Sequence, residues 1–136
     1  MEDTGQESAR LTSGALPSHI RFLGPVSDEA LAGLYRDARA LVFTPEEDFG
    51  IVPLEAQACG RPVIAYGRGG ALETVSPRTG LFFDAQTPDA LVEAVRRFEQ
   101  WEPDFRPADA RAQAERFSRA AFLRAVQAEV DAVIKP

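Results

Sequence analysis

The chain has 136 residues, 45% hydrophobic and 26% charged, with a net charge of −6 and a pI of about 4.8. This composition is that of one soluble globular domain, and the acidic balance argues against a general nucleic-acid-binding protein, which normally presents a basic face. No apolar run approaches the roughly 18 residues of a membrane-spanning helix. The polar start MEDTGQESAR has no signal-peptide core.

Residues that occur only once exclude several classes of site. His19 is the single histidine and Cys59 the single cysteine, so a His/Cys zinc site lacks ligands and no internal disulfide can form. The missing disulfide fits a cytoplasmic location. Lys135 is the single lysine and does not follow a glycine, which rules out a Walker A loop. We expect Cys59 to be a small buried apolar side chain, because no base lies beside it in the sequence.

The elements expected in chain order alternate between short apolar strands and helices. Residues 1–17 show only weak helical character, around Gln6 to Leu11, and precede a predicted domain at 18–136 that ends in a helix. Apolar runs predict four strands, at 20–23, 40–43, 63–66 and 81–83. Ser27, Thr87 and Ser118 are the expected N-caps of three helices. A short helical segment at 71–75 follows a glycine turn, and 101–107 is expected to be a break.

The segment EEDFGIVPLEAQACGRPVIAY, residues 46–66, holds two glutamates, Glu47 and Glu55, eight positions apart. Gly50 and Pro53 do not suit the interior of one long helix, so we expect a loop at 44–50 and a helix at 52–59. Pro53 then lies in the first turn and Gly60 just past the last one. The free backbone N–H groups between the two glutamates would form an anion site.

Short, wholly apolar strands separated by helices are typical of a parallel sheet covered on both faces. We therefore predict an α/β fold, a Rossmann-like and mostly parallel sheet of about four strands. In such sheets ligands bind beyond the carboxyl ends of the strands. Strand 40–43 leads directly into the loop that holds Glu47, so both glutamates should lie at that edge. The pair Gly69–Gly70 is explained by a tight turn, while Arg68 is open to two interpretations, a phosphate ligand or a solvated loop side chain.

The ordered series of motifs resembles the group 1 (family 4) glycosyltransferases. Residues 47–55, EDFGIVPLE, with the following AQACGRPVIA, resemble the E-x7-E motif of that family. The preceding stretch RFLGPVSDEALAGLYRDARALVFTP and the later GGALETV, TGLFFD and PDALVEAV resemble its flanks. The resemblance covers about residues 18–134. One pair of acids eight apart is weak evidence, but the whole series in order is strong.

The resemblance implies a fold, a reaction and roles for particular residues. These enzymes have two Rossmann-like domains (the GT-B fold), and the C-terminal one binds a nucleotide-sugar donor whose sugar is transferred with retention of configuration. Glu47 would bind hydroxyls of the sugar and stabilise the positive charge that develops on it, which makes it the catalytic residue. Glu55 would bind the ribose hydroxyls. The other implied donor contacts are the backbone against the sugar and diphosphate, Phe49, Gly50, Ile51 and Val52, and the residues near the nucleobase, Gly24, Pro25 and Val26.

The sequence also departs from this family. Two earlier strands, with basic residues that hold the diphosphate, and the whole acceptor domain are absent from it. In the sheet order 3-2-1-4-5-6 the absent strands are the central two, so strand 20–23 would have no natural neighbour. The chain would be a fragment, a truncated form that repacks or part of an assembly. Donor nucleotide, sugar and acceptor depend on the absent parts.

Three functions fit the sequence. The first is the donor-binding part of a retaining glycosyltransferase, inactive alone, and the second is a non-catalytic nucleotide-sugar-binding module. The third, a receiver-like signalling domain, is weak because Lys135 in the last helix cannot serve as its late-strand lysine. We expect no cofactor and no metal, since the nucleotide-sugar is a substrate. The donor is the expected partner, nucleic acid is not, and any peripheral membrane association would belong to the parent enzyme only.

Overall fold

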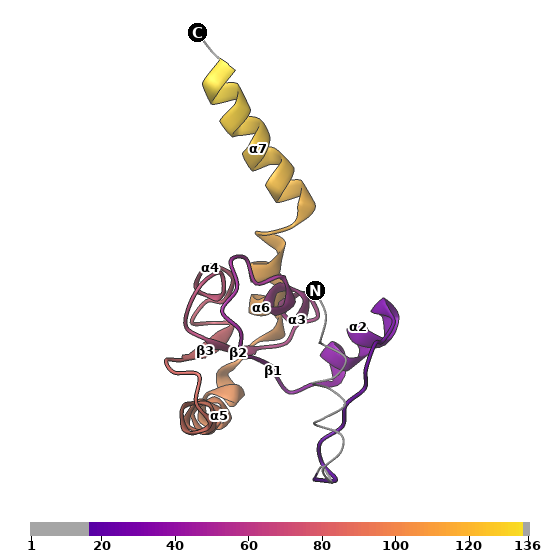
Figure 1. The fold of residues 1–136 in the computed structure, drawn as a ribbon. Helices are drawn as coiled ribbons and strands as arrows, with labels where there is room; N and C mark the ends of the chain where they lie inside the picture. The colour runs from indigo at the N-terminus through magenta and orange to yellow at the C-terminus, as the bar shows by residue number, and fades with distance from the viewer. Residues whose placement is uncertain (1–16, 135–136) are drawn as a thin grey trace, which may run out of the picture.

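A computed structural model describes residues 17–134, so the helical character expected around Gln6 to Leu11 lies outside the described part. Three parallel strands form one sheet in the order β1-β2-β3, with β1 at Leu41–Phe43, β2 at Val63–Tyr66 and β3 at Gly80–Phe83 (Figure 1). Val42 pairs with Ile64, which pairs in turn with Leu81. Parallel strands need crossover connections, and α3 and α4 provide them.

Helices occupy the segments between and after the strands. Their bounds are α2 Asp28–Asp37, α3 Ile51–Ala58, α4 Ala71–Thr74, α5 Pro88–Trp101, η1 Glu102–Asp104 (a 3-10 turn), α6 Pro107–Glu115 and α7 Arg119–Ile134. The three predicted N-caps are confirmed. Ser27 accepts from the Ala30 N–H at 3.2 Å, Thr87 from the Ala90 N–H at 3.2 Å, and Ser118 from the Ala121 N–H at 3.3 Å.

The two faces of the sheet carry two separate hydrophobic clusters. On one face Phe43, Val63 and Ala65 pack with Ala56 of α3 and with Ala71 and Val75 around α4. On the other face Ile64 and Phe83 pack with Ala94 and Phe98 of α5. Helix α6 packs on α3, and Figure 1 shows α3 and α6 on the opposite side of the sheet from α5. The predicted α/β fold with helices on both faces is confirmed.

The predicted strand at 20–23 is wrong, and the sheet therefore has three strands and not four. Phe22 is 55% exposed and Leu23 46% exposed, and β1 pairs only with β2 among the described residues. A strand is stable only when its backbone groups are paired and its apolar side chains are covered. Neither condition is met here, although the residues have the composition of a strand. The segment has no neighbouring strand to pair with among the described residues, in keeping with the lack of a natural neighbour expected from the family's strand order.

Residues 101–107 are not a simple break, and the helix after them went unpredicted. The 3-10 turn η1 follows α5, and Trp101 stacks obliquely on Phe105 with ring centroids 5.6 Å apart. Helix α6 then buries only small or polar side chains, Ala110 and Gln113. Because it lacks large apolar residues at helical spacing, α6 leaves no clear hydrophobic pattern in the sequence.

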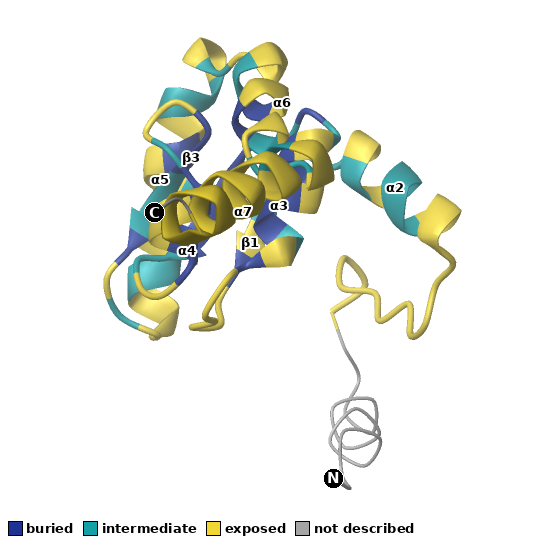
Figure 2. Ribbon diagram, turned by 90° about the horizontal axis from the view of Figure 1, so that it is seen from above, coloured by how far each residue is buried: buried dark blue, intermediate teal, exposed yellow. Residues whose placement is uncertain are grey.

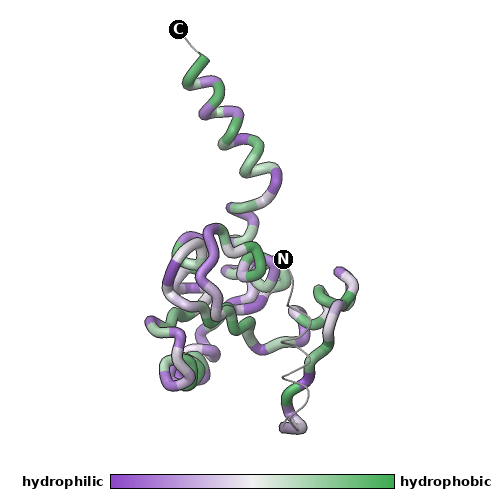
Figure 3. The backbone as a smooth tube through the Cα atoms, viewed as in Figure 1, coloured by the Kyte–Doolittle hydropathy of each residue, from purple (hydrophilic) through white to green (hydrophobic). Residues whose placement is uncertain are grey.

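Helix α7 leaves the sheet and its covering helices and contributes no buried residue (Figures 1 and 2). Its apolar side chains alternate with polar ones along its length (Figure 3). Phe122 is 63% exposed and Val133 is 83% exposed. No helix within residues 17–134 is long and apolar enough to cross a membrane.

Candidate functional site

The loop that carries Glu47 lies directly against the glycine turn that follows β2. The Gly70 N–H donates to the Glu47 carbonyl oxygen at 2.6 Å. A Cβ on Gly69 would overlap that same carbonyl oxygen, and a Cβ on Gly70 would overlap the Phe49 carbonyl and lie 2.6 Å from the Asp48 oxygen. The expectation that a tight turn alone explains the two glycines is therefore incomplete. They also let two backbone segments meet, which fixes the loop at the carboxyl ends of β1 and β2.

Helix α3 begins without a side-chain cap. Its N-cap is Gly50, which is buried and adopts a left-handed conformation, with φ of 76° and ψ of 60°. Pro53 in the first turn has no N–H, so Ile51 and Val52 carry the first N–H groups of the helix. Such groups, with the positive end of the helix dipole, are favourable for a negatively charged ligand. The predicted helix and its expected cap, Gly60 with φ of 77°, are confirmed within one residue at each end.

Glu55 projects from the middle of α3 toward α2. The Tyr35 hydroxyl donates to Glu55 Oε2 at 3.0 Å. Partial burial, and then this hydrogen bond to the carboxylate, raise the pKa of Tyr35 to about 12, so the phenol stays protonated at neutral pH. The pair lies beside a mainly apolar cavity of ≈ 280 Å³ between the two helices, lined by Asp28, Leu31, Ala32, Tyr35, Glu55, Ala58 and Cys59.

The other predicted site residues lie on the surface around these elements. Glu47 is exposed and does not line the α2–α3 cavity. Phe49 is 53% exposed and meets Phe117 edge to face, with centroids 6.2 Å apart, at the α6–α7 junction. Ile51 is exposed, and Val52 packs at the margin of the first cluster. Residues 47–52 therefore lie together at the start of α3 because they are consecutive in the chain. Glu55 lies further along the same helix.

The segment 24–26 is connected to this region through α2. Gly24 has φ of 65° with open space around its Cα, and Val26 is 40% exposed. Two residues later Asp28 lines the cavity that Glu55 also lines.

A larger cavity of ≈ 510 Å³ lies elsewhere, on the α5 side of the sheet. It is lined by Gly67, Leu72, Phe82, Phe83, Asp84, Ala90, Glu93 and Arg97. Its one cation, Arg97, already donates to the Phe82 carbonyl at 2.6 Å, and two carboxylates lie beside it. The start of α3 is the better candidate for an anionic ligand, because it offers free backbone N–H groups at the positive end of a helix dipole.

Two buried glutamines that hydrogen-bond to backbone carbonyls next to α3 were not predicted from the sequence. Gln57 is fully buried, and its amide donates to the carbonyls of Pro53 and Thr74, each at 3.0 Å. Gln113 of α6 donates to the same Thr74 carbonyl at 3.2 Å. A buried glutamine is rare without partners, but no sequence signal identifies those partners.

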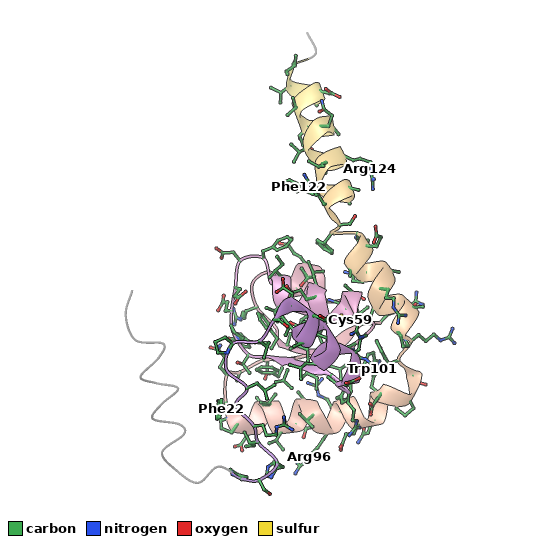
Figure 4. All side chains as sticks on the ribbon, turned by 90° about the vertical axis from the view of Figure 1, so that its right-hand side faces the viewer. Phe22, Cys59, Arg96, Trp101, Phe122 and Arg124 are labelled. Atoms are coloured by element: carbon green, nitrogen blue, oxygen red, sulfur yellow. The ribbon has the colours of Figure 1, made fainter. Side chains whose placement is uncertain are left out.

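Cys59 was expected to be buried, and this expectation is wrong. It caps the C-terminal end of α3, is only partly buried, and borders the α2–α3 cavity (Figure 4). Cys59 lines the cavity between α3 and α2, and α2 itself buries no residue, so the cysteine is not fully covered. Among residues 17–134, no group of three His, Cys, Asp or Glu side chains could hold a metal ion.

A three-stranded parallel sheet covered by helices on both faces defines a Rossmann-like α/β architecture. The same architecture occurs in the sucrose-phosphate synthase of Thermosynechococcus elongatus, a GT-B enzyme. The two structures align with a TM-score of 0.72 and 28% sequence identity over 94% of this chain and 34% of the synthase chain. The fold is thus that of part of a GT-B domain.

The chain belongs to the glycosyl transferases group 1 family, whose sequence pattern matches residues 3–121. It is 43% identical over 79 residues to a D-inositol 3-phosphate glycosyltransferase of Corynebacterium jeikeium, and this match covers 56% of this chain and 19% of that relative. The corresponding enzyme of Geodermatophilus obscurus is 40% identical over 100 residues, 68% of this chain and 22% of that relative. The chain therefore spans about a fifth of the length of these curated relatives.

A third relative gives a shorter match at higher sequence identity. A GDP-mannose-dependent monoacylated alpha-(1-6)-phosphatidylinositol monomannoside mannosyltransferase of Corynebacterium glutamicum is 60% identical over 49 residues, 36% of this chain and 13% of that relative. All three relatives are named for glycosyl transfer, and the predicted family is confirmed.

Proposed function

We propose that this chain is the donor-binding part of a retaining glycosyltransferase, and that residues 47–55 bind the nucleotide-sugar. The observation that carries this proposal is the combination of the family match over residues 3–121 with an uncapped helix start between two exposed glutamates. A cytoplasmic location belongs to the same proposal, because a single cysteine gives no internal disulfide.

The diphosphate would lie at the start of α3. The N–H groups of Ile51 and Val52 and the helix dipole favour its negative charge. Gly50 adopts the left-handed conformation that favours glycine, with φ of 76°, and this turn leads the chain into α3. The glycine turn holds the loop in place through the Gly70 to Glu47 hydrogen bond, which reduces the ordering needed when the ligand binds.

The two carboxylates would have different tasks. Glu55 accepts hydrogen bonds from the ribose hydroxyls, as carboxylates do well, and so contributes to binding of the whole nucleotide. Glu47 contacts the sugar. As the bond between the anomeric carbon and the diphosphate oxygen breaks and the acceptor oxygen bonds to the same face, positive charge develops on the sugar, and the Glu47 carboxylate stabilises it. The nucleoside diphosphate leaves with the bonding electrons, and its leaving oxygen takes the proton that the acceptor hydroxyl loses.

Substitution of each glutamate by glutamine separates the two roles. Glu55→Gln should weaken nucleoside diphosphate binding by about 1–3 kcal/mol, or roughly 5- to 150-fold, because an uncharged acceptor replaces a charge-assisted one. Glu47→Gln should leave that binding nearly intact and lower kcat in a complete two-domain enzyme that contains this segment. Calorimetric titration measures the first effect and steady-state kinetics the second. If neither change affected binding or rate, both acids would be ordinary surface residues and the proposal would fail.

A non-catalytic nucleotide-sugar-binding module is the second candidate. The observation in its favour is that no lysine occurs in residues 17–134, so that any side-chain cation for the diphosphate in the described part has to be an arginine. Both candidates predict that residues 1–136 alone do not transfer sugar at a useful rate, because a partial set of contacts loses transition-state stabilisation. They differ in the complete protein. Donor binding without turnover toward any acceptor, or toward water, would favour the module.

A further inference from the structure

Helix α2 is attached to the rest of the molecule weakly. It buries none of its ten residues, from Asp28 to Asp37. Within residues 17–134, its one side-chain hydrogen bond to another element is the bond from Tyr35 to Glu55. The two bonded residues are 20 positions apart in the sequence, and both line the α2–α3 cavity. The acceptor of the bond is the carboxylate assigned above to the ribose.

We infer that Tyr35 is a positioning residue, which holds the Glu55 carboxylate in the orientation that a ribose diol requires. The inference rests on the proposed function and deepens it. Tyr35 occupies Oε2 of Glu55 and leaves Oε1 to accept from the ligand. An exposed glutamate side chain otherwise samples many rotamers, and fixing them on binding lowers the affinity for the ligand.

The phenol suits this task at every physiological pH. Its pKa of about 12 keeps the O–H protonated, so it remains a donor and never a competing anion. The ring of Tyr35 lines the cavity together with Leu31 and Ala58, and it packs against the first hydrophobic cluster. A tyrosine has only two side-chain torsions, so a ring packed in this way presents its hydroxyl in a nearly fixed position.

The substitution Tyr35→Phe removes the hydroxyl and keeps the ring. The chain offers a matched control, Tyr66→Phe, because Tyr66 lies in β2 on the α5 side of the sheet, against Phe83, with centroids 5.8 Å apart. The two substitutions delete the same atom from the two tyrosines of the chain. Thermal unfolding of both variants establishes that each is folded before binding is compared.

The test compares UDP with 2′-deoxy-UDP and GDP with 2′-deoxy-GDP as probes, titrated into the 136-residue chain and followed by NMR at millimolar concentration. The wild type should bind the ribonucleotide of at least one pair more tightly than its deoxy form. Tyr35→Phe should weaken ribonucleotide binding about 3- to 10-fold, in line with loss of one hydrogen bond to a charged group at a partly exposed site. It should weaken deoxynucleotide binding less, so that the ratio of the two affinities falls. Tyr66→Phe should leave both affinities and their ratio unchanged.

The change in ratio is the decisive measurement, since general loosening of the fold would weaken both probes equally. If Tyr35→Phe left the ratio at its wild-type value while the wild type bound, the positioning role would be refuted and the proposed function would stand. If the folded wild-type chain bound neither UDP nor GDP, both would be refuted.

Discussion

Alanine substitutions of glycines in and near the Glu47 loop separate two causes of lost stability, backbone strain and steric overlap. Gly70 has an ordinary φ of −62°, so an alanine there meets no conformational strain. Its Cβ, however, would overlap the Phe49 carbonyl and lie 2.6 Å from the Asp48 carbonyl oxygen. Normal contacts are about 3.5–4.0 Å, so the loop would have to move by roughly 1 Å. We expect Gly70→Ala to destabilise the chain by about 2–3 kcal/mol, the range of forced overpacking.

Two other glycines supply the matched controls. Gly24 has a positive φ of 65° with nothing within 4 Å of an added Cβ, so Gly24→Ala reports conformational strain alone, about 1 kcal/mol. Gly33 lies inside α2 with open space around it, and Gly33→Ala should stabilise by roughly 0.5–1 kcal/mol through helix propensity. Gly69 combines a φ of 61° with an overlap on the Glu47 carbonyl, so Gly69→Ala should be the most destabilising of the four.

Urea unfolding of the wild type and the four variants, followed by circular dichroism, gives these free energies. The predicted order of stability is Gly33→Ala above wild type, then Gly24→Ala, Gly70→Ala and Gly69→Ala. A Gly70→Ala variant as stable as Gly24→Ala would show that the Glu47 loop is not held against the glycine turn. The site geometry derived from that contact would then be wrong.

Two further predictions concern the support of α3 and the response to pH. Gln57→Leu should cost about 2 kcal/mol, because it removes two buried hydrogen bonds. Gln113→Leu removes one bond to Thr74 and should cost about half as much in the same urea assay; equal costs would contradict the assignment of the network. The hydrogen bond from Arg39 lowers the pKa of Glu102, so this pair stabilises the fold above the ordinary carboxyl pKa and loses its effect as pH falls below about 4. Glu102→Gln should therefore reduce the steepness of acid unfolding, and an unchanged acid profile would show that the pair contributes nothing.

Most of the fold was predictable because its signals are local. Short apolar runs bounded by Gly and Pro identified β1, β2 and β3, and the hydroxyl N-caps located the starts of α2, α5 and α7. The parallel arrangement followed from strands without polar alternation. The strand predicted at 20–23 failed because local composition does not tell whether a neighbouring strand exists. Helix α6 was missed because it packs through Ala110 and Gln113 and so carries no hydrophobic periodicity.

The candidate site was predictable where its residues are consecutive. The loop, the uncapped start of α3 and its glycine cap could be derived from residues 44–60, because each depends on a nearby Gly or Pro. The contacts of that segment were not predictable. Nothing in the sequence pattern around Tyr35 indicates that its hydroxyl donates to Glu55. Likewise the second reason for Gly69 and Gly70, close approach to the Glu47 loop, depends on tertiary packing that no local pattern encodes.

An NMR titration of the isotopically labelled chain with UDP and with GDP tests the central claim most directly, since it locates the nucleotide without assuming a site. The predicted result is that the largest amide shifts occur at Phe49, Gly50, Ile51, Val52 and Glu55. Smaller shifts should follow at Gly24 and Val26, and none at the cavity between β3 and α5. Shifts centred on Asp84, Glu93 and Arg97 at that larger cavity, or no shifts at any residue, would contradict the account.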